Sequence, residues 1–599
     1  MSAAQCRNPH GLVLALGFWA ASIGRADDLA ARYRLTLNRV LQGAPPRYTA
    51  DFLLADAVPR HVRRFTQFSG DVSGRCIEAL ACVERLEGQR YALLDELLNA
   101  VPKLQKPDGY FGDDFPDGPI RPFPHMALLW GNGRMLIGLV EAYRTRRDPT
   151  ALATARKLGD FIVSIAPRLD RDDVMKEFSG DQHAVGYICW TQIIEGLVGL
   201  YELTRDARYL EVGRGMARRT FLHAGQHSHG FLTSVRGMVQ LAAVTGEREW
   251  LDRAAGLWKE VITSGNLLQH GCVPEAFKPT ILRDEGCSEA DWLRLSLALW
   301  HALEDPAYLD AAEHAWFNEF AMNQFSTGDF GHRTITPEGM GGAIPRMSRA
   351  AATGAFSAVS VAAGCARAWW CCTFHGLRAF PDVLASVFHV RGDAIHYNLP
   401  LSGIVATNGV TLRARSSLER DASCRLEVLS SDGAPRTLVV RQPPWAEPIE
   451  LTVRSGVDVQ RVQGLQVRRA WQRGDVLEIR YPLRTRVLRH PDRTNAVAFA
   501  VGPWILGVEP SGSPAFFDEP RGQNRVRVGS LEAAELLPPP MTEALRFSRF
   551  AVPVAHRGLP LIPGGYPVQP QVVWLRPIAE QTGIRDDTEW VFWFVPANP

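Results

Sequence analysis

Four residues in two short stretches carry side chains that bind metal ions. Glu285 and Cys287 supply one carboxylate and one thiol, and the adjacent pair Cys371 and Cys372 supplies two more thiols. Cysteine and carboxylate side chains are common ligands of Zn²⁺ in proteins. Adjacent cysteines close a disulfide with each other only under strain, because the peptide between them is short. The four residues predict a zinc site, and the alternative is that the cysteines are simply buried apolar side chains.

Other polar and aromatic side chains occur in or next to long loops rich in glycine, proline and histidine. These loops include residues 106–119, 178–183, 226–230 and 269–279, and a further one begins at 331. Binding residues concentrate in such loops, although a single histidine is more often a structural polar residue than a catalyst. With that alternative open, the candidate substrate-binding residues here are Asp108, Trp130, His183, His229 and His332.

Helices are expected to position these residues up to about residue 395. Four similar polar phrases each follow one apolar helical stripe and open another, at residues 145–152, 204–210, 245–251 and 303–309. An acidic residue near the start of the second stripe is favoured by the helix dipole, so each phrase predicts the turn of a helical hairpin. Self-similarity of this kind predicts stacked hairpins. A closed (α/α)₆ toroid is favoured, with an open solenoid as the alternative.

The pattern changes to alternating apolar and polar residues after about residue 395, which predicts strands. The clearest runs lie at 393–399, 410–415, 436–442, 449–454 and 476–481. Short strands separated by Gly, Pro and Asp turns indicate an antiparallel β-sandwich. Terminal runs at 551–554, 572–575 and 590–594 are expected to complete a second sheet. The predicted fold is therefore multidomain α + β: a toroid at 27–395, a β-sandwich at 396–535 and a C-terminal β segment at 536–599 that completes a second small sandwich.

Composition excludes several classes of partner. The chain has 599 residues, of which 46% are hydrophobic and 22% charged, as in ordinary globular proteins. A formal charge of +2 gives no reason to expect a nucleic-acid partner. No apolar run reaches the ~18 residues of a transmembrane helix, so no membrane span is expected. The oligomeric state is left open, and a homodimer is compatible with the sequence.

Residues 1–26 have the layout of a signal peptide. Arg7 and His10 precede an apolar run at 11–20, and small residues would allow cleavage after Ala26. The alternative is a first core helix with a frayed start. The ten cysteines show no disulfide spacing, and unmetallated thiols are at risk in an oxidising compartment. A periplasmic or secreted location is expected, with a cytoplasmic one as the alternative.

Taken together, these motifs resemble glycoside hydrolase family 127, the β-L-arabinofuranosidases and their relatives. The order is a helical toroid, Pro-Glu-Ala-Phe at 274–277, Glu-Gly-Cys at 285–287, the cysteine pair, and then β-sandwiches. The phrases at 107–111, 132–136 and 442–446 are also similar to members of that family. The resemblance covers most of the chain. It implies a retaining glycosidase that releases β-L-arabinofuranose or a related sugar from plant-type glycans.

The resemblance also implies a role for each motif residue. Glu285, Cys287 and Cys372 would hold Zn²⁺, Cys371 would be both ligand and nucleophile, and Glu275 would be the general acid/base. Zinc binding keeps thiols deprotonated at neutral pH. Four protein ligands leave no open position for a water, so this metal would not act as a hydrolytic Lewis acid. Retaining glycosidases need a nucleophile and an acid/base, and here sulfur would replace the usual carboxylate nucleophile.

Three positions depart from the family pattern. Pro274 stands where the family has glycine, and Thr373 follows the cysteine pair where the family usually has proline or glycine. Gln192 stands where the family has histidine, which makes Gln192 a further candidate substrate contact. These departures concern the sugar and leave the metal ligands in place. Two other functions stay open: another (α/α)₆ carbohydrate-active enzyme, such as a lyase or epimerase, and a non-catalytic sugar-binding protein with a structural zinc.

Overall fold

The computed structural model of the chain describes most residues between 28 and 507 and five short segments after them. The described residues are 28–42, 47–61, 63, 65–180, 184–277, 283–325, 327–336, 339–341, 369–491, 496–507, 527–528, 552–556, 571–579, 590–593 and 595–596. The candidate signal peptide at 1–26 and the candidate contact His183 lie outside them.

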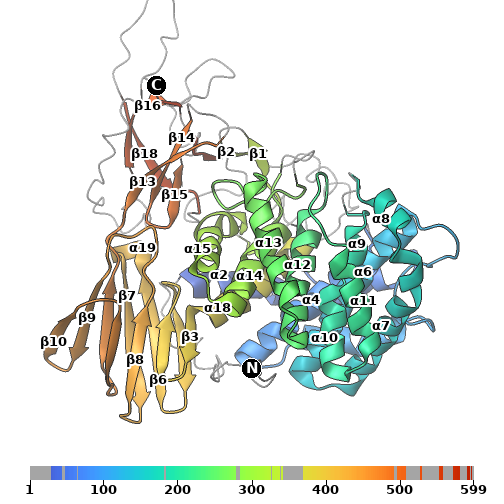
Figure 1. Ribbon diagram of the computed structural model, residues 1–599, viewed down its shortest axis with the longest axis horizontal. Coiled ribbons are helices and arrows are strands. Elements are labelled where there is room, and N and C mark those ends of the chain that lie inside the picture. The colour runs from blue at the N-terminus through green and yellow to red at the C-terminus, as the bar shows by residue number, and fades with distance from the viewer. Residues whose placement is uncertain are drawn as a thin grey trace, which may run out of the picture.

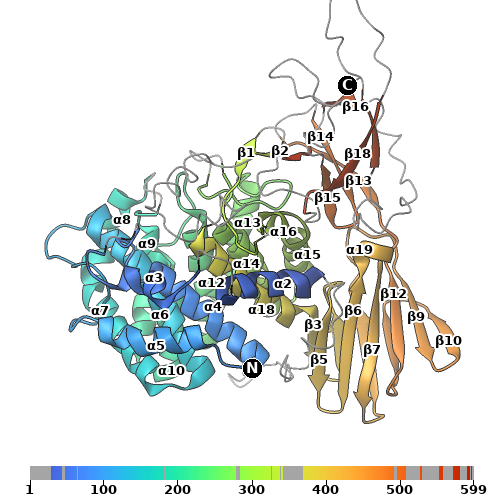
Figure 2. The same ribbon diagram turned by 180° about the vertical axis from the view of Figure 1, so that it is seen from behind.

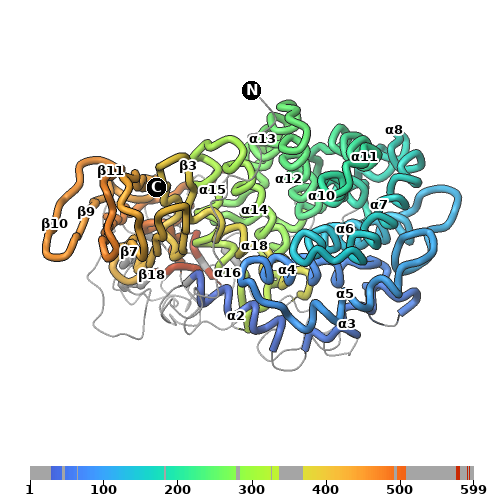
Figure 3. Tube along the Cα trace, turned by 90° about the horizontal axis from the view of Figure 1, so that it is seen from below, coloured from blue at the N-terminus to red at the C-terminus, as the bar shows by residue number. Residues whose placement is uncertain are grey.

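Six helices in the described part of the chain form a closed inner ring (Figures 1 and 3). In chain order they are α4 (Asp71–Glu87), α6 (Ala127–Arg146), α10 (Ile194–Thr204), α12 (Ser228–Thr245), α14 (Gly286–Leu303) and α18 (Trp370–Val387). Each packs against the next, and α18 returns to pack against α4. Because the first and last repeats of an open solenoid do not meet, this closure confirms the predicted (α/α)₆ toroid.

A second set of helices covers the ring from outside. Each packs on an inner helix next to it in sequence, except that α2 packs on α18 (Figure 2). The set is α2 (Asp28–Gln42), α5 (Ala92–Leu104), α7 (Pro149–Leu169), α11 (Ala207–Arg218), α13 (Arg248–Thr263) and α15 (Pro306–Ala315). Inner helices are buried nearly all round, whereas outer helices bury one face only, as α13 does.

The four polar phrases of the sequence are the turns that join inner to outer helices. In three of them a residue in the left-handed region ends the inner helix, and the next residue is an aspartate. The aspartate side chain accepts a hydrogen bond from the backbone N–H of the second residue of the outer helix, at 2.9 Å in Asp148, 3.0 Å in Asp206 and 3.0 Å in Asp305. This N-cap satisfies a donor that the helix itself leaves free.

Longer connections gather at the opposite end of the ring, where the inner helices begin. They contain short elements: α3 (Ala50–Leu54), η1 (Ala55–Ala57), η2 (Pro122–Met126), α8 (Asp172–Phe178), α9 (Ile188–Thr191), η3 (Trp316–Phe320), α16 (Ala321–Asn323), β1 (Thr334–Thr336) and β2 (Gly339–Gly341). Figure 1 shows β1, β2 and α8 at this end. The N-termini of the inner helices therefore face the long loops, where binding residues are expected.

Two sheets follow the toroid and share a buried core (Figures 1 and 2). One has the order β10 (Asp458–Val462), β9 (Glu450–Ser455), β12 (Val476–Arg480), β7 (Ser423–Ser431), β6 (Val410–Ser417) and β5 (Gly403–Thr407). The other has the order β11 (Gln466–Ala470), β8 (Pro435–Val440), β4 (Ala394–Tyr397) and β3 (Phe388–Arg391). Pairing is antiparallel except between β4 and β8, which are parallel. A short helix, α19 (Leu418–Asp421), joins β6 to β7.

A third sheet combines strands from both sides of residue 535. Its order is β13 (Thr485–Arg489), β14 (Val497–Val501), β15 (Trp504–Gly507), β18 (Gln571–Pro577) and β17 (Val552–His556). The second β unit thus begins near 485, not at the predicted 536, because β15 pairs with β18 far along the chain. Short pairings add β19 (Trp590–Val591) to β2, and β16 (Arg527–Val528) to β20 (Val595–Pro596).

The change from helix to strand occurs at residue 388. Helix α18 ends at Val387 and β3 starts at the next residue, seven residues before the predicted boundary at 395. Side chains also cross between the two parts: Trp445 Nε1 donates to Glu313 Oε2 of α15 at 2.7 Å, and Arg441 Nη1 donates to Asp310 Oδ1 at 2.8 Å. Across the described residues, the helices fall short of the length and apolarity that crossing a bilayer requires.

Candidate active site and metal centre

The four predicted metal ligands meet at the N-termini of two adjacent inner helices. Glu285 is the residue before α14, and Cys287 lies in its first turn. Cys371 and Cys372 lie in the first turn of α18. One ligand atom from each residue lies within 4.8 Å of the others, and all four side chains are buried. The positive ends of both helix dipoles favour negative charge at this point.

The donor set and its spacing fit a tetrahedral zinc ion. Cys372 Sγ lies 3.7 Å from Cys287 Sγ and 3.9 Å from Cys371 Sγ. Two sulfurs bound tetrahedrally at about 2.3 Å from one Zn²⁺ are about 3.8 Å apart. Ser288 orients the Glu285 carboxylate, because its Oγ donates a hydrogen bond to Glu285 Oε2 at 3.0 Å. These residues would therefore hold the ion without rearrangement of the sulfurs.

The three thiols differ in acidity before any metal binds. Burial opposes ionisation of Cys371, but hydrogen bonds from Cys287 and Cys372 and the charge of Arg75 outweigh it and lower the pKa of Cys371 to about 6. Burial and the neighbouring thiols raise the pKa of Cys287 and of Cys372 well above the ordinary value. Cys371 is therefore the thiol that ionises first.

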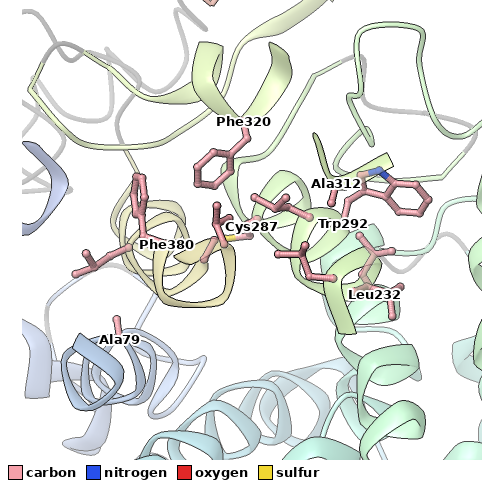
Figure 4. Close-up of a cluster of buried hydrophobic side chains, with 14 of the residues drawn as sticks. Ala79, Leu232, Cys287, Trp292, Ala312, Phe320 and Phe380 are labelled. Carbon is pink, nitrogen blue, oxygen red and sulfur yellow. The ribbon is translucent and has the colours of Figure 1, made fainter. Parts of the chain in front are cut away.

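Cys287 belongs to the buried hydrophobic core as well as to the group of metal ligands. Figure 4 shows Cys287 among buried hydrophobic residues, between Phe380 of α18 and Trp292 of α14, with Phe320 of η3 above it. The close packing at this point requires glycine at position 286, because a Cβ there would lie 3.0 Å from Cys372 Cβ and 2.7 Å from Asn323 Oδ1. A low-polarity wall strengthens the electrostatic interactions of charged groups inside it.

Glu275 reaches the same site from the loop before α14. Its backbone N–H donates to Arg283 O at 3.1 Å, and its carbonyl accepts from Ser228 N at 3.0 Å. Its side chain is buried and forms an ion pair with Arg283, whose Nη2 donates to Oε1 at 2.5 Å. Side-chain atoms of His227, Glu275 and Glu285 lie within 4.8 Å of one another, so Glu275 adjoins the ligand Glu285.

The structure places two of the candidate substrate contacts beside these groups. His332 Nδ1 lies 3.9 Å from Glu275 Oε2, and its ring packs near Trp369. Trp130 packs edge-on against His227 with the ring centroids 5.0 Å apart, and its Nε1 donates to Asp71 at 3.1 Å. These aromatic and imidazole groups are suited to stacking on a sugar and bonding its hydroxyls.

Of the other described candidates, Gln192 and His229 lie deeper in the ring, and Asp108 lies away from the site. Gln192 is fully buried behind Trp130, donating from Nε2 to the Trp130 carbonyl at 2.8 Å. His229 is also fully buried, and its Nδ1 pairs with Asp291. Asp108 is exposed in the loop after α5, where the next residue, Gly109, packs on Lys157 of outer helix α7. Position in a turn-rich loop therefore did not identify a site residue at Asp108.

A buried charged network beneath the thiols was not predicted from the sequence. Arg75 Nη1 lies 3.5 Å from Cys287 Sγ, 2.9 Å from His229 Nε2 and 3.0 Å from His375 Nδ1. Burial lowers the pKa of both histidines well below the usual value, so both are neutral and accept from Arg75. His375 could have been found, because it lies one helical turn after Cys371. Arg75 on α4 gave no such signal.

His227 is a further site residue that the sequence reasoning missed, although it lies in the loop at 226–230, two residues before the candidate His229. In the structure His227 Nε2 lies 3.6 Å from Glu285 Oε2, at the level of the carboxylates, whereas His229 lies deeper in α12. The residue just before an inner helix faces the long loops, and that rule would have favoured His227.

Comparison with known proteins agrees with this arrangement. The family model for the β-L-arabinofuranosidase GH127 catalytic domain matches residues 56–383, and the GH127 middle-domain model matches 395–483. No curated protein matches the chain in direct sequence comparison.

Two solved structures share the fold over nearly the whole chain. A GH127 β-L-arabinofuranosidase from Geobacillus stearothermophilus T6 superposes with a TM-score of 0.67 at 18% identity, covering 96% of this chain and 100% of its own. A second GH127 β-arabinofuranosidase gives 0.67 at 17% identity, covering 97% and 95%. Since the catalytic-domain model alone spans more than half of the sequence, the chain belongs to glycoside hydrolase family 127.

Proposed function

We propose that this glycosidase is a retaining β-L-arabinofuranosidase that uses Cys371 as nucleophile and Glu275 as general acid/base. The observation that carries the proposal is the position of Glu285. Its carboxylate groups with the three thiols and also with Glu275 and His227, so an ionisable thiol and an acid/base candidate adjoin the same side chain. Retaining hydrolysis needs two such groups on one sugar.

The metal expected at Glu285, Cys287, Cys371 and Cys372 is Zn²⁺, which supplies positive charge that keeps thiols deprotonated at neutral pH. Burial opposes ionisation of Cys371, but the hydrogen bonds from Cys287 and Cys372, the guanidinium of Arg75 and the dipoles of α14 and α18 favour the same ionised state. The chain therefore presents a thiolate at the site without needing a separate base to remove its proton.

In the first step the Cys371 thiolate attacks the anomeric carbon, while protonated Glu275 gives its proton to the leaving-group oxygen. A carbon–sulfur bond forms as the glycosidic carbon–oxygen bond breaks. In the second step Glu275 takes a proton from water, whose oxygen attacks the anomeric carbon and displaces the thiolate. Two inversions at one carbon give net retention, and both the thiolate and the protonated Glu275 are restored.

The sugar is proposed from the family, and the surrounding side chains suit a small furanose. Trp130, Trp369, His227 and His332 offer ring faces and imidazole nitrogens near Glu275 and Glu285. Plant-type glycans with terminal arabinofuranose are the substrates that we propose. We also propose export to the periplasm or beyond, which N-terminal sequencing of the mature protein from its host would test.

The test is a panel of aryl furanosides and pyranosides with zinc-loaded protein under reducing conditions. We expect hydrolysis of the aryl β-L-arabinofuranoside, and with methanol as acceptor a methyl glycoside of unchanged anomeric configuration by NMR. Hydrolysis of a different sugar alone would overturn the substrate, and inversion would overturn the two-step mechanism. Sugar binding with no turnover on any member would favour a binding protein with a structural metal.

A further inference from the structure

A second group of metal-binding side chains lies behind the site, on the far side of Asp284. His270 and Cys272 come from the loop that leads to Glu275, and Glu319 comes from η3. One ligand atom from each lies within 4.8 Å of the other two. All three are at most 2% exposed, and none of them is used in the proposed reaction.

Their polar atoms are left without the hydrogen bonds that buried groups normally make. Both ring nitrogens of His270 and both carboxylate oxygens of Glu319 lack a hydrogen-bond partner among the described residues. The contact between them is an ion-pair distance of 3.2 Å, from His270 Nε2 to Glu319 Oε2. Nearly all buried polar side-chain atoms in proteins have a partner, so four such atoms in one place require an explanation.

The charge around this group also calls for a cation. Asp284, Glu289 and Glu319 are all fully buried and interact with one another electrostatically. Arg333 is the positive side chain that acts on Asp284 and Glu319. Burial raises the pKa of all three carboxyls, so together with Arg333 they reach a charge of −2 only if a divalent ion is present to balance it. Burying uncompensated charge is otherwise very costly.

Not all three carboxylates are equally available. Asp284 is already satisfied, since it accepts from Asn323 Nδ2 at 2.8 Å and from the backbone of Arg333. Glu289 accepts from Val273 N, at 3.1 and 3.4 Å, and hydrogen-bonds with the thiol of Cys272. Burial lowers the pKa of His270 to about 4, which leaves its ring neutral and able to donate a lone pair.

We infer that His270, Cys272 and Glu319 form the core of a second zinc site, structural in role and separate from the Glu285 and three-cysteine centre. Glu289, which hydrogen-bonds with Cys272, is the carboxylate that we infer turns in as the fourth protein ligand. A zinc ion closed by four protein ligands is structural, because it keeps no open position for a substrate or water. Nitrogen and oxygen donors at about 2.0 Å from a tetrahedral ion lie about 3.3 Å apart, close to the 3.2 Å seen between His270 and Glu319.

Such an ion would fix three parts of the candidate active site relative to one another. Cys272 is three residues before Glu275, Glu289 is one turn after Glu285, and η3 packs against α14. The ring of His270 also packs near Phe592 of the C-terminal segment, with centroids 4.9 Å apart. The second zinc would thereby fix the distance between the acid/base loop and the helix that carries the first metal centre.

The experiment counts zinc per chain by native mass spectrometry and elemental analysis, with no activity measurement. For the full-length protein we expect two zinc ions. Cys272→Ala and the isosteric Glu319→Gln should each retain one, whereas Cys189→Ala, which removes a buried thiol of α9 far from both groups, should retain two. Cys372→Ser should lose the ion of the other centre and keep one.

Two different variants of the second group, Cys272→Ala and Glu319→Gln, keep the test decisive if one of them fails to fold. A single zinc that Cys372→Ser removes and Cys272→Ala retains would overturn the second site and leave the proposed function intact. A single zinc with the opposite behaviour would support the second site and overturn zinc at the catalytic centre. Two ions that survive both Cys272→Ala and Glu319→Gln would also overturn the assignment.

Discussion

Arg283 and Glu275 form a two-nitrogen ion pair, with Arg283 Nη2 at 2.5 Å from Glu275 Oε1 and Nε against the other oxygen. A paired guanidinium stabilises the carboxylate form of its partner. The proposed first step needs Glu275 in the protonated form. Arg283 is half-buried at the edge of the site, so substrate binding must weaken this pair before the acid can act.

Arg283→Gln should therefore shift the pH dependence of the reaction. Removing the positive charge favours the protonated form of Glu275, so the alkaline limb of the kcat/KM profile should move to higher pH. The measurement is the pH–rate profile with an aryl glycoside whose leaving group needs a proton. Arg248→Gln, which removes an exposed arginine of α13, is the matched control and should leave the profile in place. An unchanged alkaline limb in Arg283→Gln would show that the pair does not govern the acid.

Glu275→Gln should slow catalysis according to the leaving group. An amide cannot donate the proton that a poor leaving group needs, and general acid catalysis contributes about 10²–10⁴-fold. We expect a loss of that order on alkyl glycosides and a smaller loss on activated aryl glycosides, with azide restoring part of the rate. Zinc content should match wild type. Equal losses on both substrate classes would exclude Glu275 as the acid.

Covalent trapping should distinguish Cys371 from its neighbours. A haloacetamide derivative of the correct sugar places an electrophilic carbon where the anomeric carbon of the substrate would lie. Peptide mass analysis should then find the label on Cys371. Free sugar present in excess should suppress the labelling. A label on Cys372 or Cys287 would instead assign the attack to that thiol and contradict the proposed roles.

In the metal-free protein, the thiols should react at different pH values. Because the pKa of Cys371 is about 6 and those of Cys287 and Cys372 are well above the ordinary value, only Cys371 is a thiolate at pH 7. Its alkylation by iodoacetamide should fall as pH drops through about 6, since the thiolate is the reactive form. Chelated protein, quenched over a pH series and mapped by mass spectrometry, tests this. Uniform labelling of all three thiols at pH 7 would contradict it.

Asp291 should be essential for the stability of the toroid. It is fully buried, pairs with His229 and Arg236, and accepts from Thr233 Oγ1 at 3.0 Å. Asp291→Ala leaves Arg236 with one partner fewer in a buried setting, and breaking a buried pair typically costs about 3–5 kcal/mol. Urea denaturation followed by circular dichroism measures the loss. Asp252→Ala, on the exposed face of α13, should change stability by less than about 0.5 kcal/mol.

Local chemistry explains what the sequence could predict. The turns at Asp148, Asp206 and Asp305 were visible because a capping aspartate and a chain reversal act over a few residues. The candidate metal ligands can be recognised in the sequence because Glu285 and Cys287, like the cysteine pair, lie within one helical turn.

Tertiary contacts explain what could not be predicted. Arg75 meets Cys287 and His375 from positions more than two hundred residues away in the chain. The third sheet pairs Leu506 with Pro577, and the alternation of apolar residues within a strand does not identify its partner. For the same reason the sequence did not predict the group that contains His270 and Glu319, because its members come from separate segments of the chain.

Closure of the ring by α18 against α4 has a consequence for biosynthesis. The ribosome makes α4 some three hundred residues before α18, and at about 5–20 residues per second that interval is about 15–60 s. During that interval the face of α4 that α18 later covers stays exposed to solvent on the nascent chain. Two of the four ligands of the catalytic centre are also still missing. Neither the core nor the metal centre can be finished until the last helix emerges, so demand for chaperone protection should peak just before α18 is translated.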